Sequence, residues 1–369
     1  MSISQIYPWI NNKELKYLKQ TIKSTYITEN KLTERFENKF KEFVGAKYAI
    51  AVNNWTLGLF ACLKSLNIGY GDEVIVPNMT FIATANSALL CGAKVVLCEV
   101  NYKTLCLDIT HLKKLINSKT KAIIPVHLYG NSCDMDEIKK LQKKKNFYIV
   151  EDAAQGLGVR YNKKHVGTIG EVGGFSFYGN KILTTGEGGM VVTNNKKIYD
   201  FIKTFKNYGR SKKGSYIHEK IGFNFKFTDL QAAVGLAQFD KLKKGLIKKQ
   251  KIFDFYKKNL EHNNEISFIK PLDKSNQVHW FSNIICESNK SIKLLNFLKK
   301  NKIELRRTFY PLHLQPCFKN NKNIIKNGNY KESNKIYKNL LSLPSAIQIT
   351  NAELKKVVRN INLFLKKNA

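Results

Sequence analysis

The sequence has 369 residues, of which 43% are hydrophobic and 24% charged, so it is long enough to bury a large core. This composition excludes disorder, collagen and coiled coil as descriptions of the whole chain. Lys and Arg outnumber Asp and Glu by 62 to 28, a net charge of +34, which is typical of proteins that bind nucleic acid or membranes. However, Lys is spread along the chain and greatly outnumbers Arg, the residue that nucleic-acid surfaces favour for bidentate contacts. We therefore expect a solvated basic surface that attracts anionic small molecules, with no nucleic-acid partner.

The seven cysteines and seven histidines argue against disulfides and metal ligands. The cysteines are odd in number, form no C-x-x-C pair and mostly lie in apolar runs, as is typical of reduced, buried thiols. The histidines lack ligand spacing, so we expect no metal site. The first residues do not resemble a signal peptide, and no apolar run reaches roughly 18 residues. We expect a cytoplasmic protein with no membrane partner.

Short apolar runs alternate with amphipathic stretches in the first half of the chain. They predict strands at residues 49–52, 74–76, 95–100, 122–126, 147–150, 174–177 and 189–193. Several runs are rich in Val and Ile without alternation, as expected of strands buried on both faces. Helical patterns separate most of these runs. The order predicts an α/β fold in which helices sandwich a mostly parallel central sheet.

The pattern changes after residue 193. Thr228 and Gln231 form a capping box, which predicts the start of a helix. A Lys-rich helix is predicted over residues 245–260. A last amphipathic helix carries on one face Leu354, Val357, Val358, Ile361 and Leu365. We predict a large domain over residues 1–245 and a smaller α+β domain over residues 246–369.

Lys181 lies in a glycine-rich segment among small and apolar residues, whereas other lysines crowd into polar runs. Burial disfavours the ammonium form of such a lysine and frees its amine to form a Schiff base. Taken alone, the pattern is more typical of a lysine that reaches solvent from a turn. A second motif is needed to choose between these interpretations.

Glu151 and Asp152 supply that motif, because they directly follow the predicted strand at residues 147–150. Open α/β sheets bind ligands at the carboxyl ends of their strands. Pyridoxal phosphate needs a Lys for its Schiff base and an acid at its pyridinium nitrogen, and Lys181 with Asp152 would provide both. The alternative role for Asp152 is a helix N-cap.

Residues 53–56, Asn-Asn-Trp-Thr, join the first predicted strand to a helix. Backbone N–H groups and the dipole at the start of a helix bind anions. The hydroxyls of Thr56 and Ser176 are candidate further donors. The sequence therefore predicts a phosphate site here, with a plain N-cap as the alternative.

Together these motifs resemble those of the pyridoxal-phosphate-dependent sugar aminotransferases of the DegT/DnrJ type, which have the aspartate aminotransferase fold (PLP fold type I). The similarity covers nearly the whole chain. It includes residues 69–77, 80–84, 125–130, 151–155, 222–225 and 343–344. Within the family, the perosamine synthases are most similar at residues 177–181, 186–190 and 309–316.

The resemblance implies a role for each candidate residue. Lys181 would form the Schiff base and move protons, while Asp152 would hold the pyridinium proton. The other implied cofactor contacts are Trp55 and Thr56 in the phosphate loop, Phe81 on the ring face, Gln155 at the phenolic oxygen and Ser176 at the phosphate. Asn224 would reach the phosphate from a neighbouring subunit, which implies a homodimer with shared active sites. The candidates for substrate binding are Lys226, Arg306, Arg307 and His313.

Two positions depart from the family pattern. Trp55 stands where the family usually has Gly, and it would either reshape the pocket or cover the loop as a core aromatic. Lys226 stands where the family often has Arg, so the charge is kept without the bidentate fork.

The implied reaction is a ping-pong transamination. L-Glutamate would donate the amino group to a 4-keto-6-deoxy nucleotide sugar, GDP-4-keto-6-deoxymannose, and give a 4-amino sugar nucleotide of the perosamine type. The alternatives are another UDP- or dTDP-linked keto sugar, amination at C3, and a non-catalytic basic protein that binds nucleic acid on the same fold. A sugar dehydratase is disfavoured because those relatives have His in place of Lys181.

Overall fold

The computed structural model describes residues 2–212, 214, 216–286 and 290–367. Within these residues the main feature is an eight-stranded sheet. Its strands, in spatial order, are β1 (Tyr48–Val52), β9 (Gly189–Thr193), β8 (Val172–Ser176), β5 (Tyr148–Asp152), β4 (Thr120–Ile123), β2 (Glu73–Pro77), β3 (Lys94–Cys98) and β13 (Ile324–Lys326). Neighbouring strands are parallel except at β9, which runs antiparallel to both β1 and β8. The predicted mostly parallel sheet is confirmed.

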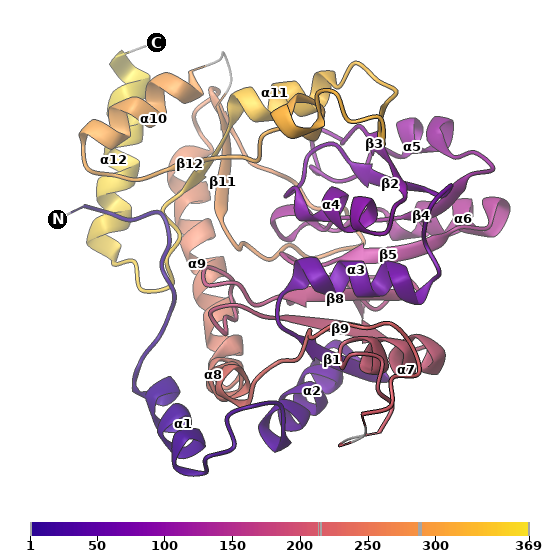
Figure 1. Ribbon diagram of the computed structural model, residues 1–369. Helices are drawn as coiled ribbons and strands as arrows, with labels where there is room; N and C mark the ends of the chain where they lie inside the picture. The colour runs from indigo at the N-terminus through magenta and orange to yellow at the C-terminus, as the bar shows by residue number, and fades with distance from the viewer. Residues whose placement is uncertain (1, 213, 215, 287–289, 368–369) are drawn as a thin grey trace.

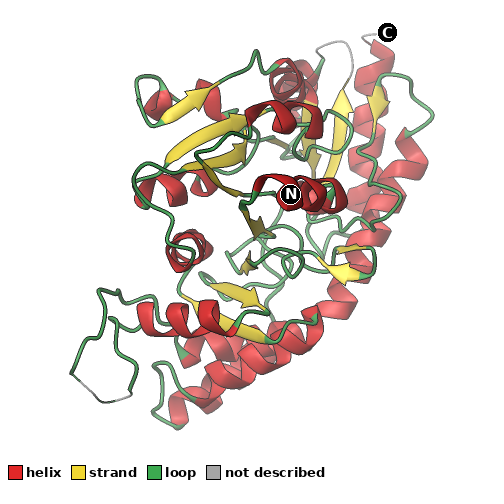
Figure 2. Ribbon diagram, turned by 90° about the vertical axis from the view of Figure 1, so that its right-hand side faces the viewer, coloured by secondary structure: helices red, strands yellow, loops and turns green. Residues whose placement is uncertain are grey.

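Helices cover both faces of this sheet, as Figure 2 shows. One face packs against α3 (Trp55–Ser65), α4 (Ala83–Leu90) and α7 (Lys196–Phe205). The other packs against α2 (Lys31–Val44), α5 (Ile109–Leu115), α6 (Met135–Lys145) and α8 (Asp229–Phe239). The predicted capping box forms at the start of α8, where the Thr228 side chain accepts a hydrogen bond from the backbone N–H of Gln231. The predicted sandwich is therefore confirmed.

A second, smaller unit contains a four-stranded antiparallel sheet. Its strands, in spatial order, are β10 (Ile266–Ser267), β11 (Ser282–Cys286), β14 (Leu340–Leu343) and β12 (Arg306–Arg307). The helices of this unit are α9 (Leu242–Leu260), α10 (Ser291–Lys300), α11 (Lys331–Asn339) and α12 (Asn351–Lys367). In Figure 1, α9 runs from α8 at the bottom of the view up to this unit. The five apolar residues predicted to share one face of the last helix are all buried in α12.

The remaining elements are short, apart from the helix near the N-terminus. They are α1 (Asn12–Lys23), the hairpin of β6 (Arg160–Tyr161) and β7 (Lys164–His165), and the 3₁₀ turns η1 (Leu128–Gly130), η2 (Leu312–Leu314) and η3 (Pro316–Phe318). Within the described ranges, no helix is both long and apolar enough to cross a membrane.

Several features of the fold, besides the reversed direction of β9, were not predicted from the sequence. β13, from the C-terminal third of the chain, pairs with β3 and extends the large sheet. Near the other end of the chain, Ile3 bridges to Ile303 and packs in the core of the smaller unit. The Lys-rich helix starts at Leu242, before the predicted start, because Gly245 is buried within it and does not interrupt it. The proposed division at residue 245 falls inside α9 and stays a prediction.

Candidate active site

The candidate residues meet at one edge of the large sheet. β1, β5 and β8 run in the same direction, so their carboxyl ends lie at the same edge. Asp152 is the last residue of β5 and Ser176 the last residue of β8. α3 begins at Trp55, shortly after the end of β1. This is the edge where ligands bind in open α/β sheets.

Asp152 is buried and receives three hydrogen bonds. Its Oδ1 accepts from the indole Nε1 of Trp55 at 2.9 Å and from the backbone N–H of Ala154 at 3.1 Å. Its Oδ2 accepts from the hydroxyl of Thr84 at 2.8 Å. Donors of this kind hold the carboxylate in one orientation, which suits a partner for a cationic ring nitrogen.

Glu151, the neighbouring carboxylate, serves a different purpose. Side chains alternate between the faces of a strand, so consecutive residues point to opposite sides. Glu151 is fully buried; its Oε2 accepts from Nε2 of His127 at 3.0 Å and from the backbone N–H of Gly167 at 2.7 Å. Although burial opposes it, hydrogen bonding to His127 holds the pKa of Glu151 below its usual value. Its acceptor capacity is used within the core, which leaves Asp152 as the carboxylate of the site.

Lys181 lies in the turn after β8, where its backbone N–H donates to the carbonyl of Tyr178 at 2.9 Å. Its Nζ lies 3.9 Å from the centroid of the Trp280 ring. Burial lowers the pKa of Lys181 to about 8, and the negative charge of Asp152 opposes this shift. A lysine with this pKa is partly deprotonated near neutral pH and is a competent nucleophile. Lys181 is half-buried, and its amine is turned against the Trp280 ring and not out of the turn.

Gln155 and Phe81 lie on the loops around this edge. The side-chain carbonyl of Gln155 accepts from the backbone N–H of Tyr129 at 2.7 Å, which leaves the amide NH₂ to donate to a ligand. Phe81 follows β2 and is 56% exposed, with its ring centroid 6.0 Å from that of Phe309. An exposed ring of this kind is available to stack on a planar ligand.

The start of α3 has the features of an anion site. The Asn54 side chain caps the helix by accepting from the backbone N–H of Leu57 at 2.9 Å. Thr56 lies in the first turn, where backbone N–H groups face away from the helix. Ser176 pairs in register with Gly189, and a Cβ at Gly189 would lie only 2.9 Å from the backbone nitrogen of Trp55. The glycine therefore allows the helix start to approach the strand that carries Ser176.

Asn224 and Lys226 lie between α7 and α8. This segment runs beside the candidate phosphate loop, since the backbone N–H of Asn53 donates to the carbonyl of Phe225 at 3.1 Å. Asn224 is exposed.

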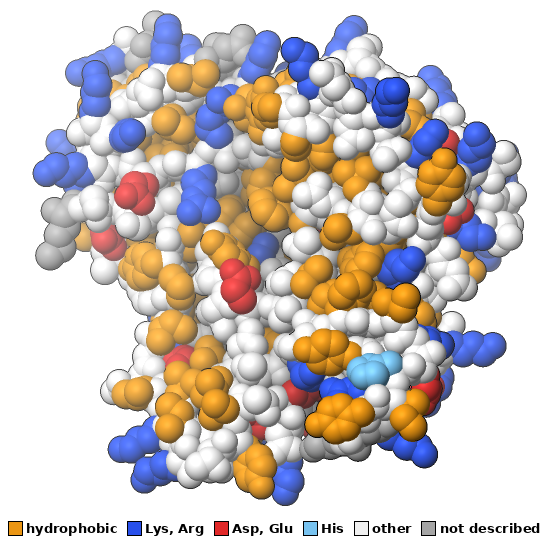
Figure 3. Space-filling view, in the orientation of Figure 1, with side chains coloured by type: hydrophobic (Ala, Val, Ile, Leu, Met, Phe, Trp, Pro, Cys, Tyr) orange, Lys and Arg blue, Asp and Glu red, His pale blue; other side chains and the backbone are white. Residues whose placement is uncertain are grey.

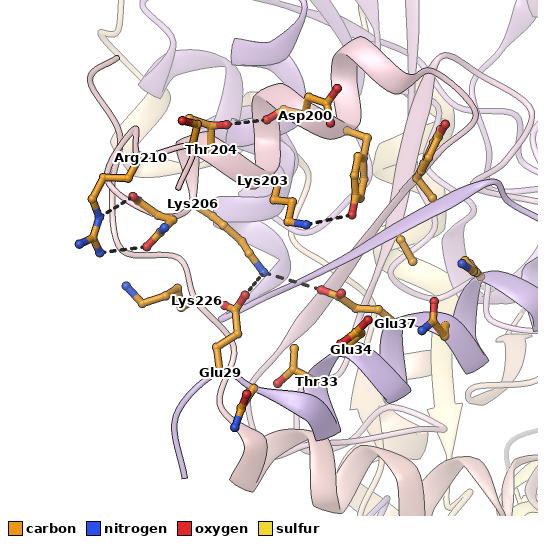
Figure 4. Close-up of a pocket in the computed structure, with 18 of the residues that line it drawn as sticks. Glu29, Thr33, Glu34, Glu37, Asp200, Lys203, Thr204, Lys206, Arg210 and Lys226 are labelled. Atoms are coloured by element: carbon orange, nitrogen blue, oxygen red, sulfur yellow. Dashed lines mark hydrogen bonds and ion pairs between the residues drawn. The ribbon is translucent and has the colours of Figure 1, made fainter. Parts of the chain in front are cut away.

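Lys226 lines a cavity of about 730 Å³ between α2 and α7, together with Glu29, Lys206 and Arg210 (Figure 4). The pKa of Lys226 is lowered, first by burial and then by the charge of Arg210. The cavity is thus a charged space distinct from the surroundings of Lys181.

The remaining candidates come from the C-terminal third of the chain. Asn78, which follows β2, donates from Nδ2 to Nδ1 of His313 at 2.8 Å, so His313 is tied to the edge of the large sheet. Arg307 stacks on Tyr337, with 3.9 Å from Cζ to the ring centroid, and donates to the carbonyl of the same residue at 3.0 Å. Arg306 is exposed. Arg307 is therefore engaged within the smaller unit, whereas Arg306 and His313 remain candidates for ligand contact.

Two residues of the site were not identified from the sequence. Thr84 holds Oδ2 of Asp152, and Trp280 lies beneath the amine of Lys181. Thr84 is the last residue of segment 80–84, one of the segments that are similar to the family. The sequence therefore contained a signal from which Thr84 could have been identified. Trp280 precedes β11 in the smaller unit, and no local pattern links it to Lys181, because their contact depends on how the two units pack.

Comparisons with known proteins identify the family of the chain. Residues 8–362 match the model of the DegT/DnrJ/EryC1/StrS aminotransferase family. The GDP-perosamine synthase of Escherichia coli O157:H7 is 36% identical over 363 residues, 97% of each chain. The GDP-perosamine synthase of Vibrio cholerae is 36% identical over 315 residues, 84% of this chain and 86% of that protein.

Solved structures are similar over nearly the full length. An aminotransferase from Psychrobacter cryohalolentis has a TM-score of 0.91 with 28% identity and covers 98% of each chain. The PLP form of the putative sugar aminotransferase Spr1654 from Streptococcus pneumoniae has a TM-score of 0.93 with 25% identity. It covers 100% of this chain and 99% of its own.

Proposed function

The chain belongs to the DegT/DnrJ/EryC1/StrS aminotransferase family, whose members are pyridoxal-phosphate-dependent sugar aminotransferases, and from this premise we propose its substrates. The amino donor is L-glutamate and the acceptor is GDP-4-keto-6-deoxymannose, which becomes a 4-amino sugar nucleotide of the perosamine type. The similarity to two GDP-perosamine synthases, each 36% identical, supports this acceptor.

The described side chains fit pyridoxal phosphate. A lysine amine with a pKa of about 8 lies within the electrostatic influence of a buried carboxylate, Asp152. The start of α3, the Thr56 hydroxyl and Ser176 offer donors for a phosphate, and Gln155 offers an amide donor. When bound, this cofactor accepts the electron pair that is left when a substrate carbon loses its proton. The pairing of Lys181 with Asp152 is the observation on which the proposal mainly depends.

Each of these residues then has a defined task. Nζ of Lys181 takes up the proton from the α-carbon of L-glutamate in one half of the reaction and supplies a proton to C4 of the sugar in the other. The carboxylate of Asp152 keeps the ring nitrogen protonated. Trp280 covers one side of the lysine amine, and the burial of Lys181 keeps this amine partly deprotonated at neutral pH.

We infer a homodimer with shared active sites, in which Asn224 and Lys226 contribute to the site of the partner subunit. The segment that carries them projects from the body in Figures 1 and 2. Figure 3 shows apolar side chains exposed at the lower right of the view. Within this segment, Tyr216 and Ile221 are almost fully exposed, Ile221 at 88%. Covering such a surface with a second copy would remove apolar area from water. In the dimer, Asn224 would donate to the phosphate of the partner's site, and Lys226 would offer its charge to an anionic substrate group.

The visible absorption spectrum of the purified protein tests the proposal. A band of the bound cofactor is expected, with loss of the band on adding L-glutamate and its return on adding GDP-4-keto-6-deoxymannose. Return with a UDP- or dTDP-linked keto sugar instead would refute the nucleotide. If no band appears after incubation with pyridoxal phosphate, the enzymatic function is refuted and the non-catalytic alternative is favoured. Salt-dependent retention of the protein on DNA would then test that alternative.

A further inference from the structure

Trp55 occupies an unusual place for the first residue of a helix. Its side chain is only 5% exposed and turns back against the sheet. A Cβ at Gly58 would lie 2.6 Å from Cε3 of its ring, and a Cβ at Gly174 would lie 2.3 Å from Cζ3. The ring therefore fills space that these two glycines leave open, and close packing fixes its orientation.

This fixed ring directs its N–H at Asp152. The indole nitrogen can only donate, so the hydrogen bond of 2.9 Å from Nε1 requires Oδ1 of Asp152 to be the acceptor. The backbone N–H of Ala154 donates to the same oxygen at 3.1 Å. Oδ2 receives the Thr84 hydroxyl, which itself lies 3.1 Å from the hydroxyl of Thr80. Oδ1 thus has two donors, whereas Oδ2 has one and keeps acceptor capacity for another.

We propose that Trp55 is a positioning residue that acts on the cofactor through Asp152. The inference rests on the proposed function, because it takes the ring nitrogen of pyridoxal phosphate as the further donor to Asp152. Trp55 and Ala154 hold Oδ1 in place, and Oδ2 is left to accept from the protonated ring nitrogen. Glycine, which the family usually has at this position, offers no side-chain donor.

The hydrogen bond itself can be tested without cofactor or catalysis. The chain has three Trp residues, so ¹⁵N-labelled apoprotein should give three indole N–H resonances, and Trp55→Phe identifies one of them. The isosteric Asp152→Asn variant replaces a charged acceptor by a neutral one. We expect the Trp55 resonance to move upfield in this variant while that of Trp9 stays in place. An unmoved Trp55 resonance overturns the proposal.

The effect on the cofactor is measured with Trp55→Phe, which removes the N–H and keeps an aromatic ring. A hydrogen bond to a charged group is lost, so we expect pyridoxal phosphate to bind roughly 10-fold or more weakly. We also expect the L-glutamate-driven loss of the visible band to slow by about 10- to 100-fold at saturation, with little change in the half-saturating glutamate concentration. Trp9→Phe, away from the site, is the matched control and should behave like the unaltered protein.

The outcomes separate the two hypotheses. If the unaltered protein binds pyridoxal phosphate and Trp55→Phe binds it with the same affinity and loses the band at the same rate, the positioning role is overturned. The proposed function then still stands. Unaltered protein that binds none overturns both. If Trp55→Phe does not fold, Trp9→Phe and Trp280→Phe assign the other two indole resonances, and the shift of the remaining one in Asp152→Asn still decides whether Trp55 holds the carboxylate.

Discussion

Lys249 gives a sharp prediction about stability, because it is a buried amine that hydrogen-bonds to backbone carbonyls. It lies on α9 with 2% of its surface exposed, and its Nζ donates to the carbonyl oxygens of Trp280, at 2.7 Å, and of Ser345. Burial lowers the pKa of Lys249 from its ordinary value of 10.5 to about 7. Between these values the unfolded chain holds a proton that the folded protein has released. Unfolding therefore takes up a proton, and the free energy of unfolding should rise with pH in this window.

A difference of one bound proton between the unfolded and folded states changes the free energy of unfolding by ~1.4 kcal/mol per pH unit. Between about pH 7 and pH 10 the change is about 4 kcal/mol. Lys249→Met keeps the length of the side chain and removes its titration, so the difference in unfolding free energy between unaltered protein and variant should rise with this slope. Urea denaturation followed by circular dichroism at several pH values measures it. Groups that titrate in both proteins, including Lys181, cancel in the difference.

Lys244→Met, at an exposed position of the same helix, is the matched control and should give a difference that does not depend on pH. Lys249→Met also removes two hydrogen bonds, which adds an offset but no slope. A difference that stays constant from about pH 7 to about pH 10 would refute the reasoning, because it would mean that Lys249 titrates alike in the folded and unfolded chain.

Other predictions concern the site. Lys181→Ala should abolish the visible band and turnover while circular dichroism stays unchanged; near-normal turnover would contradict the mechanism. Gly58→Ala should lower the unfolding free energy by about 1–2 kcal/mol, since the added methyl overpacks the Trp55 ring, and should become stabilising in a Trp55→Ala background. If Gly58→Ala lowers the unfolding free energy equally in both backgrounds, overpacking against the Trp55 ring is not the cause. Mixing inactive Lys181→Ala and Asn224→Ala subunits should restore part of the activity, and no recovery in verified mixed dimers would contradict shared sites.

The sequence predicted the strands that carry continuous apolar runs, because burial on both faces leaves a strong local signal. Their observed ends differ by only a few residues; for example, β5 ends at Asp152. β13 was missed because three residues, Ile324–Lys326, carry too little pattern, and their pairing with β3 depends on contacts between distant parts of the chain. The reversed direction of β9 was missed for a related reason, since a buried strand has the same composition whichever way it runs.

For the candidate site, the sequence identified residue types but not their geometry. It placed Glu151 and Asp152 together at the end of a strand, and only the structure separates a carboxylate satisfied by His127 from one directed at the ligand edge. Trp55 was predicted either to reshape the pocket or to cover the loop as a core aromatic. It is a core aromatic, and its N–H nevertheless reaches the site. That dual character comes from Gly174 on β8, which is remote in sequence.

The two central groups of the site share one physical arrangement. The amine of Lys181 lies against Trp280 and the carboxylate of Asp152 against Trp55, and each indole N–H has a polar partner of its own. Large rings exclude water, so desolvation and the attraction between the two charges both grow. Because the pKa of Lys181 falls to about 8 despite the opposing charge of Asp152, desolvation outweighs attraction. In the proposed transamination, this desolvation supplies the free amine that Lys181 needs near neutral pH.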